Sequence, residues 1–262
     1  MASSRISLGF MSSTVRRRLL LAATLASLLC SLACGGGVFK RQYEYEEELY
    51  LALDGSATLN VNASVAALVA LRGADLNVDP KARIDRGAVR ALFEGPGAEV
   101  TRVSLSRRHG RRFVHVGVNL ADLRRARGLA PFAWSEYRLA RQGDVVQFRQ
   151  RVGAAAGRPV GAVGWDGSEL VAFRVHVPSA IPFHNSPGTI QRGNILEWEQ
   201  PLTARLAGTP LDVQIDMEPE SILYTTLLLF GATIVAAAAA FGVVIWLFVR
   251  RGRDADPSAS HG

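Results

Sequence analysis

Four histidines in the central part of the chain are the residues best suited to catalysis or metal binding. They lack the spacing of zinc ligands, both among themselves and with a second cysteine: His109, His115, His176 and His184. The sequence also lacks the motifs of a nucleophile elbow, a zinc hydrolase, a P-loop and a dinucleotide-binding fold. We therefore expect a non-enzymatic protein without a metal or a cofactor.

A dense acidic run comprises Glu44, Glu46, Glu47 and Glu48. Carboxylates at this density also occur in calcium sites and in acid catalysts. Charged side chains more commonly mark the solvated face of a strand at the edge of a sheet. We therefore expect an edge strand here.

The strongest charge feature lies between residues 102 and 127, where eight arginines stand against a single acid, Asp122. In a domain held at a bilayer, such a patch binds anionic head groups at roughly 1 kcal/mol per basic residue. The alternative is a solvated hairpin tip and helix face, neutralised by acids elsewhere. The residues that we expect to bind an anionic surface are Arg107, Arg108, Arg111, Arg112, Arg124 and Arg125.

The net charge of +7 does not indicate nucleic-acid binding. Most of it comes from arginines that flank the two apolar segments near the ends of the chain: Arg5, Arg16, Arg17, Arg18, Arg250, Arg251 and Arg253. Basic residues in these places orient membrane segments. We expect a membrane and no nucleic acid among the partners.

Residues 1–33 have the composition of a secretory signal peptide. Three arginines at 16–18 precede the apolar run 19–29, and Ser31 and Ala33 supply small residues before a cleavage site. The run S-L-A-C-G-G-G resembles a bacterial lipobox, in which Cys34 would be lipidated. Ordinary cleavage at the same bond is the alternative, and either route leaves no cysteine pair for an internal disulfide.

Residues 222–249 form an uncharged apolar run of 28 residues, which is long enough to cross a bilayer. Arginines follow at once and predict that this end lies in the cytoplasm. The expected organisation is a signal peptide (1–33), an extracytoplasmic domain (34–220), a transmembrane helix (221–249) and a short cytoplasmic tail (250–262). The expected location is the bacterial cytoplasmic membrane.

Between the two apolar segments, alternating patterns and turn signals predict three β-hairpins. Their strands are expected at 43–53 and 57–63, at 100–106 and 113–119, and at 132–139 and 145–152. One helix is predicted at 65–72, and a second from residue 80 or 86 to 94. A third is predicted directly after Asn119, which would be its cap. Residues 153–167 read as a loop, and strands are expected at 170–177, 194–198 and 211–217. The domain is therefore predicted to be α+β, around an antiparallel sheet with a few short helices.

The assembled pattern resembles the LppM-type lipoproteins of bacterial envelopes. The resemblance rests on the signal ending at Cys34, the segment DGSATLNV (54–61), the block at 173–202 with Asn185, Asn194 and Trp198, and the single span followed by arginine. It implies a curved sheet that encloses an apolar ligand such as a lipid or glycolipid. The arginine-rich middle departs from the family pattern.

The leading hypothesis is a non-enzymatic, membrane-anchored envelope protein whose exported domain binds lipid or glycolipid. A protein-interaction or scaffolding module is the second hypothesis, and an envelope hydrolase is the third. A pocket lined by apolar side chains from sheet and helices would favour the first. A filled core with an exposed apolar patch would favour the second.

Overall fold

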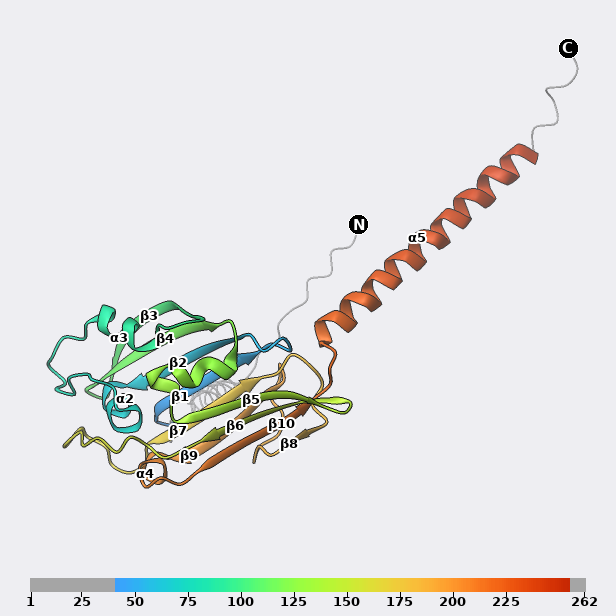
Figure 1. Ribbon diagram of the computed structural model, residues 1–262. Coiled ribbons are helices and arrows are strands. Elements are labelled where there is room, and N and C mark those ends of the chain that lie inside the picture. The colour runs from blue at the N-terminus through green and yellow to red at the C-terminus, as the bar shows by residue number, and fades with distance from the viewer. Residues whose placement is uncertain (1–40, 255–262) are drawn as a thin grey trace, which may run out of the picture. The chain divides into compact units, whose positions relative to one another are not determined.

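The computed structural model describes residues 41–254, with side chains as far as Arg251. Two β-sheets and a few short helices form the domain, and a long helix follows it (Figure 1). The α+β class predicted from the sequence is therefore confirmed, although the strands divide between two sheets. The signal peptide, Cys34 and residues 255–262 lie outside the described residues.

The larger sheet has six strands. In spatial order they are β3 (Ala98–Arg108), β4 (Arg111–Leu120), β2 (Ala57–Ser64), β1 (Tyr43–Leu51), β7 (Leu170–His176) and β9 (Ile195–Pro201). All neighbours pair antiparallel except β1 and β7, which pair parallel. A parallel pair needs a long connection. Here the chain between β1 and β7 includes a complete hairpin of the second sheet. Short-range hairpin signals cannot predict such a pairing.

Strand β1 is an interior strand, so the edge-strand prediction for the acidic run is wrong. It has β2 on one side and β7 on the other. Glu44 and Glu47 are buried, whereas Glu46 and Glu48 are half-buried on the outer face of the sheet. Burial of two carboxylates is tolerated because each meets a buried arginine, Arg111 for Glu44 and Arg72 for Glu47.

The second sheet contains four strands, in the order β5 (Ser135–Gln142), β6 (Val145–Val152), β10 (Leu211–Met217) and β8 (Phe183–His184). One hydrophobic core includes side chains from both sheets, among them Leu49, Phe173, Phe148 and Ile215. The predicted hairpin at 132–152 is confirmed, but its first strand begins later. Residues Ala130–Phe132 form a short 3-10 turn, η2, instead.

Two predicted helices are present, and both begin at a side-chain cap. Ser64 caps α2 (Val65–Arg72) by accepting a hydrogen bond from the Ala67 N–H. Asp85 caps α3 (Arg86–Phe93) in the same way through Gly87, so α3 begins at residue 86 and not at Pro80. The two helices pack against β2, β3 and β4.

The remaining short elements follow the strands. After Asn119, β4 continues to Leu120, and Asp122 caps the 3-10 helix η1 (Leu123–Gly128); the prediction of Asn119 as the cap is wrong. Helix α4 (Leu202–Leu206) follows β9 and was not predicted. Residues 153–169 contain no helix or strand, as the glycine content predicts.

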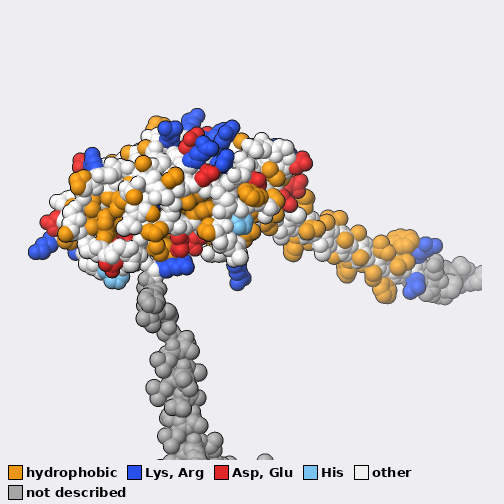
Figure 2. Space-filling model, turned by 90° about the horizontal axis from the view of Figure 1, so that it is seen from below, with side chains coloured by type: hydrophobic (Ala, Val, Ile, Leu, Met, Phe, Trp, Pro, Cys, Tyr) orange, Lys and Arg blue, Asp and Glu red, His pale blue; other side chains and the backbone are white. Residues whose placement is uncertain are grey.

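The last element is α5 (Ile222–Asp254). Residues Ile222–Arg251 have a mean hydropathy of 2.5 in their most apolar stretch, and none of that stretch is buried in the protein. By length and composition α5 is therefore able to cross a membrane. Figure 2 shows the exposed apolar side chains along this helix, with basic side chains near the end of its described part.

Candidate functional site

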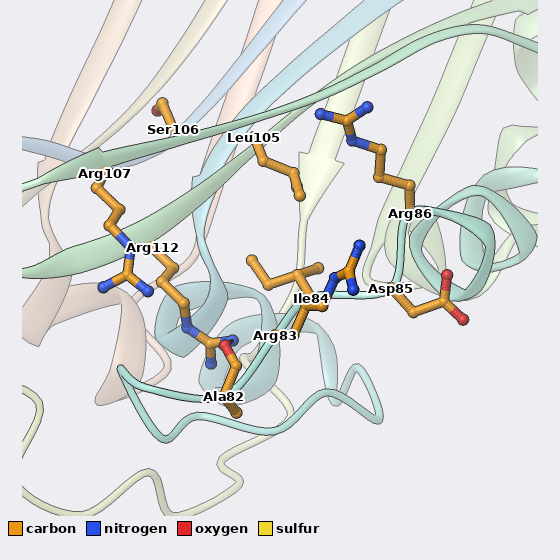
Figure 3. A pocket seen from close by; sticks show the side chains of 9 residues that line it. All are labelled: Ala82, Arg83, Ile84, Asp85, Arg86, Leu105, Ser106, Arg107 and Arg112. Carbon is orange, nitrogen blue, oxygen red and sulfur yellow. Dashed lines mark hydrogen bonds between the residues drawn. The ribbon is translucent and has the colours of Figure 1, made fainter.

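An open groove of about 910 Å³ lies between the chain segment before α3 and strand β3, and we call it the arginine groove. Its charged lining consists of four arginines and one acid. The lining residues are Ala82, Arg83, Ile84, Asp85, Arg86, Leu105, Ser106, Arg107 and Arg112 (Figure 3). Three different parts of the chain therefore contribute cations to one surface depression.

The floor of the groove is apolar. Ile84 and Leu105 are half-buried and pack against the hydrophobic core, and Figure 3 shows them between the arginines. The one acid, Asp85, is the cap of α3, and its carboxylate accepts a hydrogen bond from the Gly87 N–H over 2.8 Å. The groove thus combines a small apolar surface with an excess of positive charge.

Arg112 connects the two walls of the groove. It is buried, and its guanidinium donates hydrogen bonds to the backbone oxygens of Asn77 and, over 2.7 Å, of Ala82. Burial and the nearby Arg107 lower the pKa of Arg112, and Asp79 acts in the opposite direction. The carbonyl partners fix the loop 77–82 but do not neutralise the charge.

Within the described part of the chain, the arginines of the groove form no ion pair with an acidic residue. Among the residues that the structure describes, none of Arg83, Arg86 and Arg107 takes part in an ion pair, and neither does Arg112. The side chains of Arg83, Arg86 and Arg107 are also exposed to solvent. Arginine forms charge-assisted, bidentate hydrogen bonds with phosphate and carboxylate groups, so the chemistry of this cluster suits an anion.

The arginine groove contains only two of the six predicted arginines, Arg107 and Arg112. Arg111 and Arg112 were expected to bind an anionic surface, which needs exposed side chains, but both are buried. The turn contains only His109 and Gly110, both at positive φ, so the next two residues already belong to β4 and point to opposite faces. Arg112 forms part of the groove wall, and Arg111 is buried beneath the loop before β7.

Arg111 is 8% exposed and serves an internal charge cluster. Its guanidinium lies 3.1 Å from Glu44 and 3.4 Å from Glu169, and it donates a hydrogen bond to the Gly164 oxygen over 2.7 Å. These partners hold the loop before β7 against the sheet. Arg111 is therefore not available to an external anion.

The other predicted residues lie outside the groove. Arg108 stacks over the Phe113 ring, with 4.1 Å from the guanidinium carbon to the ring centroid. Arg124 and Arg125 belong to η1 and pair with Asp122 over 2.9 and 3.9 Å. Because η1 follows the far end of β4, a strand length of about 30 Å separates these two residues from the hairpin tip.

Sequence reasoning missed Arg83 and Arg86. They belong to the segment K-A-R-I-D-R at residues 81–86, where three basic residues precede and open α3. Local charge density is a usable signal for this segment. Its apposition to β3 depends on the packing of α3 against the sheet, and that packing is not readable from the segment itself.

The space between the sheets around β1 contains a buried polar network centred on Glu47. The Glu47 carboxylate accepts hydrogen bonds from Tyr45 (2.9 Å), Tyr137 (2.7 Å), Gln150 (2.7 Å) and Arg72 (3.0 Å). Burial raises the pKa of both tyrosine hydroxyls well above the ordinary value. A ligand enclosed at this point would have to displace the donors that hold the Glu47 carboxylate.

The fold and the groove define a two-sheet α+β domain with a basic surface groove, followed by an apolar helix able to span a membrane. The NMR structure of the folded domain of the Mycobacterium tuberculosis LppM protein is similar, with a TM-score of 0.37 and 12% sequence identity. The match covers 70% of this chain and 94% of that domain. No family model and no curated protein matches the chain.

This neighbour is of the kind that the sequence resembles. Its TM-score and identity are too low to assign the chain to that family or to transfer a function to it. Membership of the LppM-type lipoproteins therefore stays a prediction.

Proposed function

We propose that this protein is a membrane-anchored bacterial envelope protein whose exported domain holds the anionic head group of a lipid or glycolipid in the arginine groove. The observation that carries this proposal is the cluster of Arg83, Arg86, Arg107 and Arg112 around an apolar floor, without acidic partners among the described residues. Arginine is the residue that best matches phosphate geometry, which favours a phosphorylated head group.

The dimensions of the groove suit a lipid head group better than a whole lipid molecule. Its volume of about 910 Å³ is at the upper end of ordinary ligand sites, but it is open to solvent. Ile84 and Leu105 offer only enough apolar surface for the glycerol or the first methylenes next to a phosphate. We infer that the acyl chains stay in a bilayer or micelle while the head group enters the groove.

The anchoring part of the proposal rests on α5, which is apolar and is followed by Arg250 and Arg251. These arginines favour a cytoplasmic C-terminal end and an extracytoplasmic domain. A signal peptide at residues 1–33 and an acyl anchor on Cys34 would add a second attachment. Both are proposals from sequence, since these residues are outside the described part.

The test is a binding titration with the full-length protein in zwitterionic nanodiscs. Dihexanoyl phosphatidic acid is the main probe, and dihexanoyl phosphatidylcholine and inorganic phosphate are the comparison probes. Isothermal titration calorimetry should show binding of the phosphatidic acid and, more weakly, of phosphate. The phosphatidylcholine should not bind, because its positive group faces four cations.

The variant for this test replaces Arg83, Arg86 and Arg107 with glutamine. A matched control replaces Arg124, Arg125 and Arg127 with glutamine. These arginines are also exposed, and their replacement removes the same charge at the other end of β4. The groove variant should bind on the order of 100-fold more weakly, and the control variant should bind nearly as the unmodified protein does. An equal loss of affinity in both variants would show that binding depends on net charge alone. This result would overturn the assignment of the arginine groove as the binding site.

A protein-interaction module is another function that the sequence leaves open. Titration with polyglutamate separates the two hypotheses. Tight binding of polyglutamate without binding of phosphatidic acid would assign the groove to an acidic protein partner and overturn the lipid proposal.

A further inference from the structure

Three polar side chains line up across neighbouring strands on the outer face of the larger sheet. The Ser106 hydroxyl on β3 lies 2.7 Å from Nε2 of His115 on β4, and Nδ1 of the same ring lies 2.9 Å from Oδ1 of Asn62 on β2. This is the order of contacts in a nucleophile, a base and a group that orients the base. The chain positions, 62, 106 and 115, give no linear motif.

The sheet itself fixes this arrangement. Asn62 is directly opposite His115 in the β2–β4 ladder, and Ser106 is diagonal to His115 in the β3–β4 ladder. Antiparallel neighbours at such positions stand within side-chain reach on one face. Ser106 borders the arginine groove, but Figure 3 shows its side chain on the other side of β3 from Leu105. The Ser106–His115–Asn62 contacts thus lie beside the arginine groove, and they involve none of its four arginines.

The hydrogen bonds select one form of the histidine ring. The Asn62 oxygen accepts only, so Nδ1 carries the hydrogen, and Nε2 is left to accept the Ser106 hydroxyl hydrogen. Desolvation lowers the pKa of His115, and the nearby cations Arg108 and Arg102 lower it further, while Glu46 acts in the opposite direction. The ring is therefore neutral at pH 7 and able to take a proton.

A cation also lies on the strand face that carries the hydroxyl. Arg108 is two residues from Ser106 on the same strand face, and its guanidinium stacks over Phe113, the residue directly opposite Ser106. A cation at this place stabilises negative charge that develops on an oxygen near Ser106. Ser106, His115 and Asn62 are each partly exposed, so a small substrate reaches the hydroxyl from solvent.

We propose that Ser106, His115 and Asn62 form a hydrolytic site for carboxylic esters on the outer face of the larger sheet. Ser106 Oγ bonds to the ester carbonyl carbon while its proton passes to Nε2 of His115. The bond from that carbon to the alcohol oxygen breaks, and the alcohol leaves with the proton from Nε2. Water then gives a proton to Nε2 and its oxygen to the acyl group, the carboxylic acid departs, and Ser106 regains its hydrogen.

The first test is labelling of the folded, full-length protein in detergent with a fluorophosphonate probe, followed by mass spectrometry of the labelled peptide. A single label should appear on Ser106. Ser106→Ala should abolish it, and His115→Gln should slow it by about 100-fold or more, the usual size of a general-base contribution. Ser104→Ala is the matched control, because Ser104 faces His115 directly without a hydrogen bond to it and should leave labelling unchanged.

Hydrolysis of p-nitrophenyl acetate tests turnover and the positioning role of Asn62. The unmodified protein should hydrolyse the ester faster than Ser106→Ala does. In Asn62→Asp the added carboxylate favours protonated His115, so the acidic limb of the pH–rate profile should move to higher pH. Labelling at other serines, equal labelling of His115→Gln, or equal hydrolysis by Ser106→Ala would overturn the proposal and make the three residues a structural polar ladder.

Discussion

Tyr137 on β5 donates its hydroxyl hydrogen to Glu47 on β1 over 2.7 Å, and this buried hydrogen bond joins the two sheets. The same carboxylate pairs with Arg72 at the end of α2, with both side chains 1% exposed. One acidic residue therefore ties together two sheets and a helix. Its charge is matched by Arg72, and its two oxygens are satisfied by several donors.

Glu47→Gln should destabilise the domain strongly, because it leaves Arg72 as a buried cation without an anion. We expect a loss of about 3–5 kcal/mol in the free energy of unfolding. Denaturant titration of the full-length protein, followed by tryptophan fluorescence, measures it. Glu136→Gln, on the exposed face of β5, is the control and should change little. A small loss at Glu47 would mean that Arg72 finds solvent or another partner.

Arg111→Met should lower the stability of the domain. Arg107→Gln, in the same hairpin, should not. The first change leaves Glu44 and Glu169 buried without their cation, which we expect to cost about 3–5 kcal/mol. The second removes an exposed side chain and should stay within about 0.5 kcal/mol. Comparing the two unfolding midpoints checks the assignment of Arg111 to the interior; similar midpoints would contradict it.

Glu48 should make the domain sensitive to acid. The hydrogen bond from His176 lowers the pKa of Glu48 below its ordinary value of 4.5. A carboxyl group whose pKa is lowered by folding stabilises the fold above the ordinary value, and this stabilisation is lost as the pH falls through the lowered one. Glu48→Gln should therefore flatten the fall of the melting temperature below about pH 4.5. An unchanged acid profile would show that other carboxyl groups govern it.

Cys34, which is outside the described residues, has its own test. If the lipobox-like sequence is processed, metabolic labelling with a palmitate analogue should tag the protein in its native bacterium. Cys34→Ser should abolish the tag. A tag that persists in this variant would overturn lipidation at Cys34, and an untagged unmodified protein would favour ordinary cleavage.

The sequence by itself determined the parts whose cause is local. Hydrophobicity summed over consecutive residues predicts α5, because a span needs only a continuous apolar run. Alternation and turn residues predict the hairpins, and the caps Ser64 and Asp85 are hydrogen bonds within three residues. Most strand positions followed from these short-range effects.

Tertiary structure decided what depends on contacts between distant segments. The parallel pairing of β1 with β7 turned an expected edge strand into an interior one. The partners of Glu47 on β5 and β6 are 90 and 103 residues away from it along the chain. Charge density alone cannot separate Arg111 from Arg107, because burial depends on which acids and which loop the fold brings to each side chain.

The same reason applies to both candidate sites. The arginine groove needed α3 to pack against β3, and the Ser106–His115–Asn62 contacts needed the register of three adjacent strands. The register of these strands cannot be read from composition or from residue spacing. The long-range packing that buries the core sets it, because a slip of one residue would turn every side chain of a strand to the opposite face.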